Sequence, residues 1–407
     1  MFDIKRVRST KPIVIAILLA ILALSGCIGP RGWPGVVAIG DTVFVGSMDG
    51  SLFRLEVSAR LKDKDGDRLS KADGEWVWEP EAGPGGSIFS CGQVGQFSTG
   101  ALYGPPAVGN ATVRNETVEA VFIGAYTGKV YAITQYGDDV WDEPFETGGS
   151  IVGGVAVAND TLFVGSSDGK LYAVDVSTGR AKRGFDPYPT GDKIVSTPVV
   201  QDGVVYFGSL DQKFYAIDAD TGELKWDKPF KTGGGIGSKP LVVNGVVYFG
   251  SFDSKFYAVN AETGTQEWVF GEAGNWFWAQ ALYHDGIIYA CSLDHNVYAI
   301  DADGGELASE WHTNPFPTVG KIRSSPAIVG DVLVVASEVD KEKAKVYGID
   351  LENGEEKWQH ELKSSILAPL SAAGGKVYVN SRRDNTVYAF DGETGRQDWS
   401  IPLGKVE

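Results

Sequence analysis

Cysteine is scarce in this chain, with only Cys27, Cys91 and Cys291 among 407 residues. Small secreted domains that depend on disulfides are dense in cysteine, so the sequence excludes a disulfide scaffold. Cys91 and Cys291 fall in distant parts of the chain, and we expect no disulfide between them. We expect Cys291 to be a small buried apolar side chain.

Histidine is also scarce, and the usual catalytic motifs are missing. The four histidines, His284, His295, His312 and His360, do not have the spacing of a metal site. The chain contains no Gly-x-Ser-x-Gly elbow, no His-Glu-x-x-His pair and no P-loop. We therefore expect no catalytic residues and no enzyme activity.

Basic residues are outnumbered, 36 lysines and arginines against 53 acidic residues, which gives a formal net charge of −17. Proteins that bind nucleic acid use lysine and arginine to displace counterions from phosphates. Such an acidic surface excludes a nucleic-acid partner and is repelled by anionic lipid as well.

The N-terminus lacks an apolar run long enough to span a bilayer, because residues 13–24 provide 12 apolar residues where about 20 are needed. Basic residues precede this run, as in a signal peptide. Leu24-Ser25-Gly26-Cys27 follows and matches the bacterial lipobox. The sequence predicts a signal peptide at residues 1–26, a lipidated Cys27 and a short tether at 27–32. The protein would then be anchored on the extracytoplasmic side of an inner or an outer membrane.

A repeat of about 42 residues occupies the rest of the chain. Its clearest marker is an aromatic residue in a Tyr-Ala or similar step, found at Phe53, Tyr131, Tyr172, Tyr215, Tyr257, Tyr298, Tyr347 and Tyr388. Periods near this length with strand-like content are typical of propellers. We therefore predict an all-β, eight-bladed β-propeller over residues 33–407, with an insertion around 58–100 and ring closure between complete blades.

One repeat, residues 193–230, predicts four short antiparallel strands, as in one propeller blade. We expect them at residues 199–200, 204–207, 214–217 and 223–226. The last strand carries Trp226, four residues after Gly222, and the same spacing returns in other repeats. A large aromatic side chain at a fixed place suits packing between neighbouring blades, so we assign these tryptophans no ligand.

The repeated pattern Tyr215-Ala216-x-Asp218-x-x-Thr221-Gly222-x-x-x-Trp226 resembles that of the pyrroloquinoline-quinone (PQQ)-type β-propeller repeat family. This family includes quinoprotein alcohol dehydrogenases and a cofactor-free lipoprotein branch around the outer-membrane assembly factor BamB. The quinoproteins carry an adjacent cysteine pair, a calcium shell and long inter-blade insertions, and this chain lacks the cysteine pair and the insertions. The resemblance therefore implies the cofactor-free branch, without PQQ.

Two groups of residues are candidates for binding. Asp63, Asp65 and Asp67 alternate as in a calcium loop, but Arg68 replaces the expected glycine, and a solvated surface turn is favoured over a metal site. The second group, predicted at the mouth of the central channel, contains Trp276, Phe277, Trp278, Lys321 and Arg323. Aromatic and cationic side chains there can hold a peptide or a sugar, but we favour the alternative that they fill the wide channel as a plug.

The function that fits these observations is a lipid-anchored, monomeric, non-catalytic scaffold that binds proteins of the cell envelope. By analogy with BamB, such a scaffold would serve in envelope protein assembly. The alternatives are a PQQ-binding oxidoreductase or redox sensor and a surface glycan-binding protein. Because the tether before Trp33 is short, we expect partners to bind the face of the ring that points away from the membrane.

Overall fold

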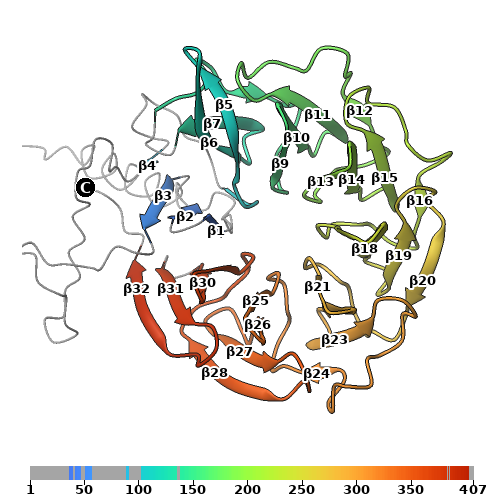
Figure 1. The fold of residues 1–407 in the computed structure, drawn as a ribbon, viewed down its shortest axis with the longest axis vertical. Helices are drawn as coiled ribbons and strands as arrows, with labels where there is room; N and C mark the ends of the chain where they lie inside the picture. The colour runs from blue at the N-terminus through green and yellow to red at the C-terminus, as the bar shows by residue number, and fades with distance from the viewer. Residues whose placement is uncertain are drawn as a thin grey trace, which may run out of the picture.

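The computed structural model describes residues 36–39, 42–46, 51–56, 89–90, 102–134, 138–382, 384 and 386–402. Its sheets stand around a common axis as the blades of a propeller, in the order of the sequence (Figure 1). No helix that could cross a membrane occurs in this part of the chain. Cys27, Asp63, Asp65 and Asp67 lie outside the described residues, as do the signal peptide, the tether and most of the insertion.

Each sheet contains four consecutive strands. The first sheet is β1 (Val36–Ile39), β2 (Thr42–Gly46), β3 (Ser51–Glu56) and β4 (Phe89–Ser90). The second and third are β5 (Ala107–Val113), β6 (Glu116–Gly124), β7 (Lys129–Thr134), β8 (Phe145–Glu146), then β9 (Val155–Ala158), β10 (Thr161–Gly165), β11 (Lys170–Asp175), β12 (Tyr188–Pro189). The fourth and fifth are β13 (Val199–Gln201), β14 (Val204–Gly208), β15 (Lys213–Asp218), β16 (Phe230–Lys231), then β17 (Leu241–Val243), β18 (Val246–Gly250), β19 (Phe256–Asn260), β20 (Gln266–Phe270). The sixth and seventh are β21 (Leu282–His284), β22 (Ile287–Cys291), β23 (Asn296–Asp301), β24 (Phe316–Pro317), then β25 (Ala327–Val329), β26 (Val332–Glu338), β27 (Ala344–Asp350), β28 (Glu356–Leu362). The eighth is β29 (Ser371–Ala373), β30 (Lys376–Ser381), β31 (Thr386–Asp391) and β32 (Gln397–Pro402).

The all-β propeller class predicted from the repeats is confirmed. Seven of the sheets, from β5 to β32, are described with their side chains, and the first mainly through its strand pairing. β4, which lies inside the predicted insertion, pairs with β3 as the outer strand of the first sheet. The first blade lies between the last and the second: β1 is beside β29, and Phe44 of β2 packs with Leu102 and Val121 of the second blade. The outer strand of the last blade is its own β32.

The second strands β10 and β14 are buried throughout, because a neighbouring blade covers each of their faces. All five residues of β10 and of β14 are buried, whereas the three residues of the inner strand β13 are half-buried. This explains why the second strands are continuous apolar runs without alternation.

The predicted position of the fourth strand is wrong in the repeat used as the type. Leu224 makes only an isolated bridge to Ile217, and the fourth strand is β16, where Phe230 pairs with Phe214. Pro229 interrupts the chain after Trp226 and cannot donate a ladder hydrogen bond. In the next blade no proline intervenes, and β20 runs continuously through Trp268, as predicted.

The repeated tryptophans join neighbouring blades, as predicted. In five blades the indole Nε1 donates a hydrogen bond of 2.7–3.1 Å to a backbone carbonyl of the following blade. Trp226, for example, donates to Ala261 at 2.9 Å, and its ring lies against Gly264 of the same neighbouring turn. A Cβ on Gly264 would lie 2.5 Å from Trp226, and its φ is +72°. The glycine of such a turn therefore has two roles: it adopts the positive φ that the turn requires, and it leaves room for the tryptophan of the preceding blade.

A single aspartate organises the turn that presents this glycine. Asp218 Oδ1 accepts hydrogen bonds from the backbone N–H groups of Asp220 and Thr221, at 3.0 and 2.8 Å. These bonds favour the charged carboxylate, and the hydrogen bond from Thr221 N–H leads the causes that lower the pKa of Asp218. The Asp-x-x-Thr-Gly part of the repeat is thus a local turn that carries an inter-blade contact.

Candidate functional site at the channel mouth

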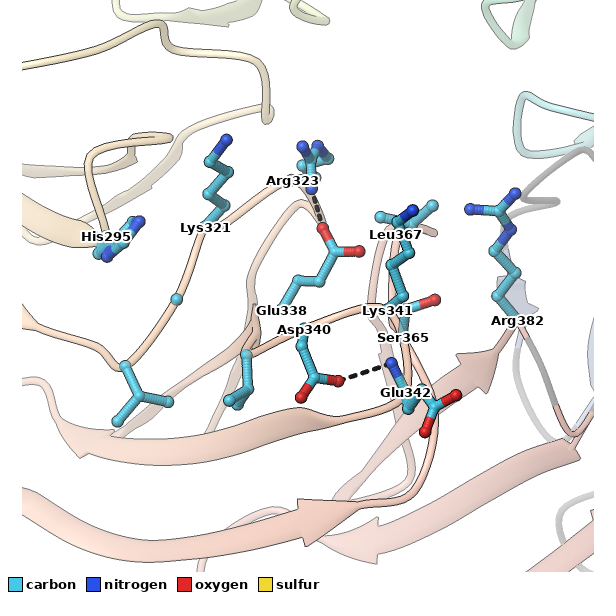
Figure 2. Close-up of a pocket in the computed structure, with 13 residues that line it drawn as sticks. His295, Lys321, Arg323, Glu338, Asp340, Lys341, Glu342, Ser365, Leu367 and Arg382 are labelled. Atoms are coloured by element: carbon cyan, nitrogen blue, oxygen red, sulfur yellow. Dashed lines mark hydrogen bonds and ion pairs between the residues drawn. The ribbon is translucent and has the colours of Figure 1, made fainter.

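A cavity of about 1030 Å³ opens on one face of the ring, where loops of the sixth, seventh and eighth blades converge. Figure 2 shows the cationic ends of Lys321, Arg323 and Arg382 pointing toward the same open side. The loops that form it connect the second strand to the third and the fourth strand to the next inner strand. The lining residues are His295, Val319, Gly320, Lys321, Arg323, Glu338, Val339, Asp340, Lys341, Glu342, Ser365, Leu367 and Arg382.

A repeated backbone hydrogen bond brings these loops together. The N–H of Glu338, the last residue of β26, donates to the carbonyl of Lys321 at 2.8 Å, and the N–H of Arg382 donates to the carbonyl of Ser365 at 3.0 Å. The same bond joins Leu293 to Trp276 and Phe252 to Gly235 in the preceding blades, at 2.9 Å each. Each blade thus presents one residue from each of two loops at the mouth, and the identity of this pair differs between blades.

Positive charge predominates in the cavity, with four lysines and arginines and His295 beside three carboxylates. Arg323 forms an ion pair with Glu338. Burial, and then the nearby guanidinium of Arg382, lowers the pKa of Arg323. Within the described part of the chain, the side chains of Lys321, Lys341 and Arg382 form no ion pair.

The five residues predicted at the channel mouth do not all lie in one site. Lys321 and Arg323 line the cavity, and their binding of a ligand stays a prediction. Trp276 and Trp278 do not line it; they stack on Phe252, with ring centroids 4.6 and 5.4 Å away. Trp276 remains 44% exposed, so this stack offers an aromatic surface on the loop equivalent to the one that carries Val319.

Phe277 is wrong as a residue facing a ligand, because only 1% of it is exposed. It packs against Phe256 and Tyr298 in the core between the fifth and sixth blades. The middle residue of this step faces the core in the other blades too, as the fully buried Ile236 and Ile322 show. Successive side chains of an extended segment point to opposite sides, so only its two neighbours face the mouth.

The small residues that precede the aromatic step have a packing role. Gly235 and Gly237 lie against Phe252, and a Cβ on Gly237 would be 2.9 Å from the Phe252 ring. Their lack of side chains leaves room for Phe252 to reach the two tryptophans of the next blade. Glycine in one repeat and tryptophan in the next therefore contribute to the same packing: Phe252 lies between Gly235 and Gly237 on one side and Trp276 and Trp278 on the other.

Sequence reasoning missed most of the cavity, including Glu338 and Arg382. Each follows a serine at the end of the second strand, at the position that Leu210 and Phe252 occupy in other blades. Alignment of the repeats at this serine finds the change from apolar to charged residues. The longer spacing before Tyr347 also indicates extra residues in the loop of Asp340 and Lys341.

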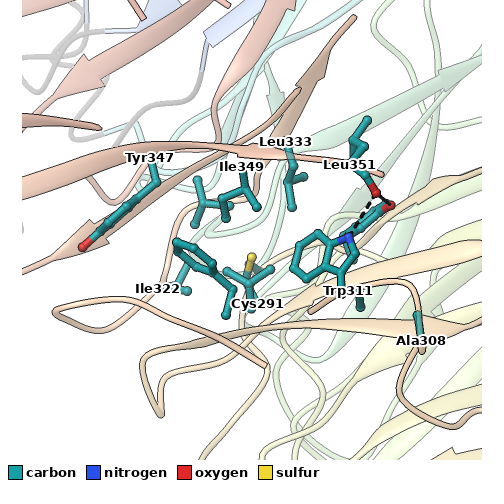
Figure 3. Close-up of a cluster of buried hydrophobic side chains, with 14 residues drawn as sticks. Cys291, Ala308, Trp311, Ile322, Leu333, Tyr347, Ile349 and Leu351 are labelled. Carbon is teal, nitrogen blue, oxygen red and sulfur yellow. Dashed lines mark hydrogen bonds between the residues drawn. The ribbon is translucent and has the colours of Figure 1, made fainter. Parts of the chain in front are cut away.

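Cys291 belongs to the core, as predicted. It is buried among Ile322, Leu333, Tyr347 and other side chains between the sixth and seventh blades (Figure 3). Burial raises the pKa of its thiol, which keeps it protonated and poorly nucleophilic. No group of histidine, cysteine and carboxylate side chains suited to a metal occurs among the described residues.

Three of the four large apolar side chains that are exposed in the described part of the chain lie on loops of the kind that form the cavity. The large hydrophobic residues that are exposed in the described part of the chain are Val269, Trp276, Val319 and Val339. Val319 and Val339 line the cavity, and Trp276 lies on the equivalent loop of the preceding blade. Apolar and aromatic residues beside arginine are typical of the energetically important part of a protein interface.

Known structures resemble this one over most of its length. A computationally designed protein, Ika8, has a TM-score of 0.63 and 16% identity, and the match covers 89% of this chain and 97% of that one. BamB from Moraxella catarrhalis has a TM-score of 0.62 and 18% identity, covering 88% of this chain and 95% of that one. The quinohemoprotein alcohol dehydrogenase ADHIIG from Pseudomonas putida HK5 has a TM-score of 0.53 and 17% identity, covering 74% and 66%. At these identities the similarity shows the fold alone.

The sequence itself shows the family. A search of curated protein sequences finds no significant match. The family model described as outer membrane protein assembly factor BamB matches residues 40–185, 126–226, 184–290 and 293–405, which together span nearly the whole propeller. The chain therefore belongs to the BamB family of repeat propellers.

Proposed function

We propose that this protein is a non-catalytic, lipid-anchored, eight-bladed scaffold that binds proteins in the cell envelope, in support of envelope protein assembly. Membership of the BamB family supports this proposal, and so does the similarity to the BamB structure. The observation that carries it is the channel-mouth face, where Val319 and Val339 line a cavity whose cations Lys321, Lys341 and Arg382 form no ion pair among the described residues. The face used by partners is then the one from which the inner strands are entered, not the opposite face expected from the short tether.

The proposal is tested by photo-crosslinking at single sites in cells that express the protein. A crosslinking amino acid at Val319, which is 52% exposed, is expected to capture one or a few defined proteins. The matched control is Val269, which is 39% exposed but lies on the outer strand β20. Equal capture at both positions, or none at Val319, would count against a scaffold that works through its channel mouth.

Anchoring gives a separate prediction for Cys27, which the lipobox assigns as the acylated residue. Replacing Cys27 by serine is expected to move the protein from the membrane fraction to the soluble fraction, because its acidic surface has no other attraction to anionic lipid. Fractionation after a high-salt wash measures the effect, with Cys291→Ser as the control. A Cys27→Ser variant that stays with the membrane would show a different anchor.

One other function has a specific observation in its favour. The exposed stack of Trp276 on Phe252 can receive the apolar face of a sugar ring, which favours glycan binding as the second candidate. Retention on immobilised polysaccharide that is lost in Trp276→Ala, without protein crosslinks at Val319, would support it. PQQ binding is disfavoured, because the chain has no adjacent cysteine pair.

A further inference from the structure

We propose that the channel-mouth cavity recognises a single carboxylate on an extended, otherwise apolar segment of a partner polypeptide. This inference rests on the proposed scaffold function and names the chemistry of its partner. Three observations support it: cations without ion-pair partners, carboxylates already engaged within the protein, and apolar side chains beside both.

The cations are placed to receive an anion. Burial lowers the pKa of Arg323, and the guanidinium of Arg382 is near enough to lower it further through charge repulsion. Lys321 and Lys341 line the same cavity, and neither forms an ion pair within the described part of the chain. A carboxylate in this space would relieve the repulsion and can accept two hydrogen bonds from one guanidinium.

The carboxylates of the cavity do not neutralise all of this charge. Glu338 is engaged by Arg323 and is itself mostly buried. Asp340 accepts a hydrogen bond of 2.7 Å from the backbone N–H of Glu342, which holds its carboxylate in the loop. Four permanent cations face three carboxylates, so the excess is about one positive charge. One carboxylate on the ligand matches that excess.

The net charge of the protein limits how acidic the ligand can be. A chain with a formal charge of −17 repels strongly acidic molecules at long range, so the cavity is a local exception on an acidic surface. A polymer with many negative charges is disfavoured, because only one of them could reach the cavity. A single acidic residue avoids most of this repulsion and retains the short-range attraction.

The apolar lining of the cavity favours apolar residues on either side of that carboxylate in the ligand. Val319, Val339 and Leu367 line the cavity, and Val319 and Val339 are 52% and 41% exposed. The volume of about 1030 Å³ lies at the upper end of the range for small-molecule pockets, and the cavity is therefore large enough for a short stretch of peptide. An aspartate or glutamate between aliphatic residues fits both kinds of lining.

Fluorescence anisotropy with synthetic peptides tests this inference on the full-length protein in detergent. The probe is a dye-labelled, N-acetylated, C-amidated heptapeptide, Gly-Val-Leu-Asp-Leu-Val-Gly, and its partner probe has asparagine in place of aspartate. We expect the aspartate peptide to bind about tenfold more tightly, as for loss of one charge-assisted contact. Arg382→Gln and Lys321→Gln are each expected to weaken its binding about tenfold and to leave the asparagine peptide unaffected.

The matched control is Lys255→Gln, which removes the same charge from an exposed lysine in a loop of the fifth blade, outside the cavity. It should leave the affinity for the aspartate peptide unchanged. Arg323 is not used, because its removal would strand the buried carboxylate of Glu338. Equal affinity for the two peptides overturns the inference, as does an equal loss in all three variants. Displacement of the peptide by an equimolar amount of sulfate would also overturn it, because the cavity would then be a general anion site.

The same variants separate this inference from the scaffold function. If Val319 captures a protein in cells and Arg382→Gln does not reduce that capture, the scaffold stands and the carboxylate chemistry is wrong. If the peptides are discriminated as expected but Val319 captures no protein, the cavity binds carboxylates and the scaffold function is wrong. Capture at Val319 that falls in Arg382→Gln and Lys321→Gln, but not in Lys255→Gln, supports both.

Discussion

Raising the pH from 10 to 12 is expected to destabilise the propeller strongly. Burial raises the pKa of Tyr206, Tyr248 and Tyr289 to about 12 each, from an ordinary value of 10. All three side chains are at most 4% exposed. Below pH 10 the tyrosines are protonated in both states, and their contribution to stability is complete. Between pH 10 and 12 the unfolded chain loses these protons while the folded chain keeps them, so the free energy of unfolding falls.

The size of this effect is comparable with the stability of a whole domain. A shift of two pKa units corresponds to on the order of 2–3 kcal/mol for each tyrosine by pH 12, against about 5–15 kcal/mol for a typical domain. Urea unfolding at pH 9, 10 and 11 measures it, and the loss should steepen above pH 10. Tyr289→Phe is expected to reduce the slope by up to about 1.4 kcal/mol per pH unit. A free energy of unfolding that stays constant between pH 10 and 11 would contradict the prediction.

Replacing Gly264 by alanine is expected to destabilise the protein by about 3 kcal/mol. The backbone of Gly264 has a φ of +72°, which costs an alanine about 1–2 kcal/mol. The new Cβ would also lie 2.5 Å from Trp226 of the preceding blade, and such overpacking costs about 1–3 kcal/mol. Trp226 cannot easily move away, because its indole N–H is bound to the carbonyl of Ala261.

Gly203→Ala is the matched control for this substitution. Gly203 has a φ of +76°, almost the same as Gly264, but a Cβ there would have no atom within 4 Å. The control therefore carries only the backbone cost, about 1–2 kcal/mol. The difference between the two variants in urea unfolding measures the contact between blades. Equal losses would show that the tryptophan accommodates the methyl group and that the contact does not restrain the glycine.

The tyrosines with a raised pKa and the tryptophans that join the blades donate hydrogen bonds to the same backbone carbonyls. The carbonyl of Ala261 accepts from Trp226 Nε1 at 2.9 Å and from Tyr206 Oη at 3.3 Å. The carbonyl of Ala302 accepts in the same way from Trp268 and Tyr248 of the preceding blade. One carbonyl per turn thus anchors two side chains of its neighbour. Both predictions above disturb this contact. High pH removes the proton of the tyrosine hydroxyl, and Gly264→Ala places a methyl group against Trp226.

The channel mouth was only partly predictable, and the reason is geometric. The sequence places Trp276, Phe277 and Trp278 in one step, but only the first and last can face the same side of an extended segment. Their partner Phe252 is in the preceding blade, and the cations of the cavity come from loops in three blades. Residues that meet in this way are far apart in the chain, and no local pattern joins them.

The sequence by itself determined the repeat, its strand content and the packing role of the tryptophans, because every blade must make the same contacts with its neighbours and so repeats the same residues. It also determined the acidic surface and the lipobox, which are properties of the chain and not of its fold. Only the tertiary structure decided that the fourth strand begins at Phe230 in one blade and runs through Trp268 in the next. It alone brought Lys321, Arg323 and Arg382 into one cavity, because these side chains meet through the ring and not along the chain.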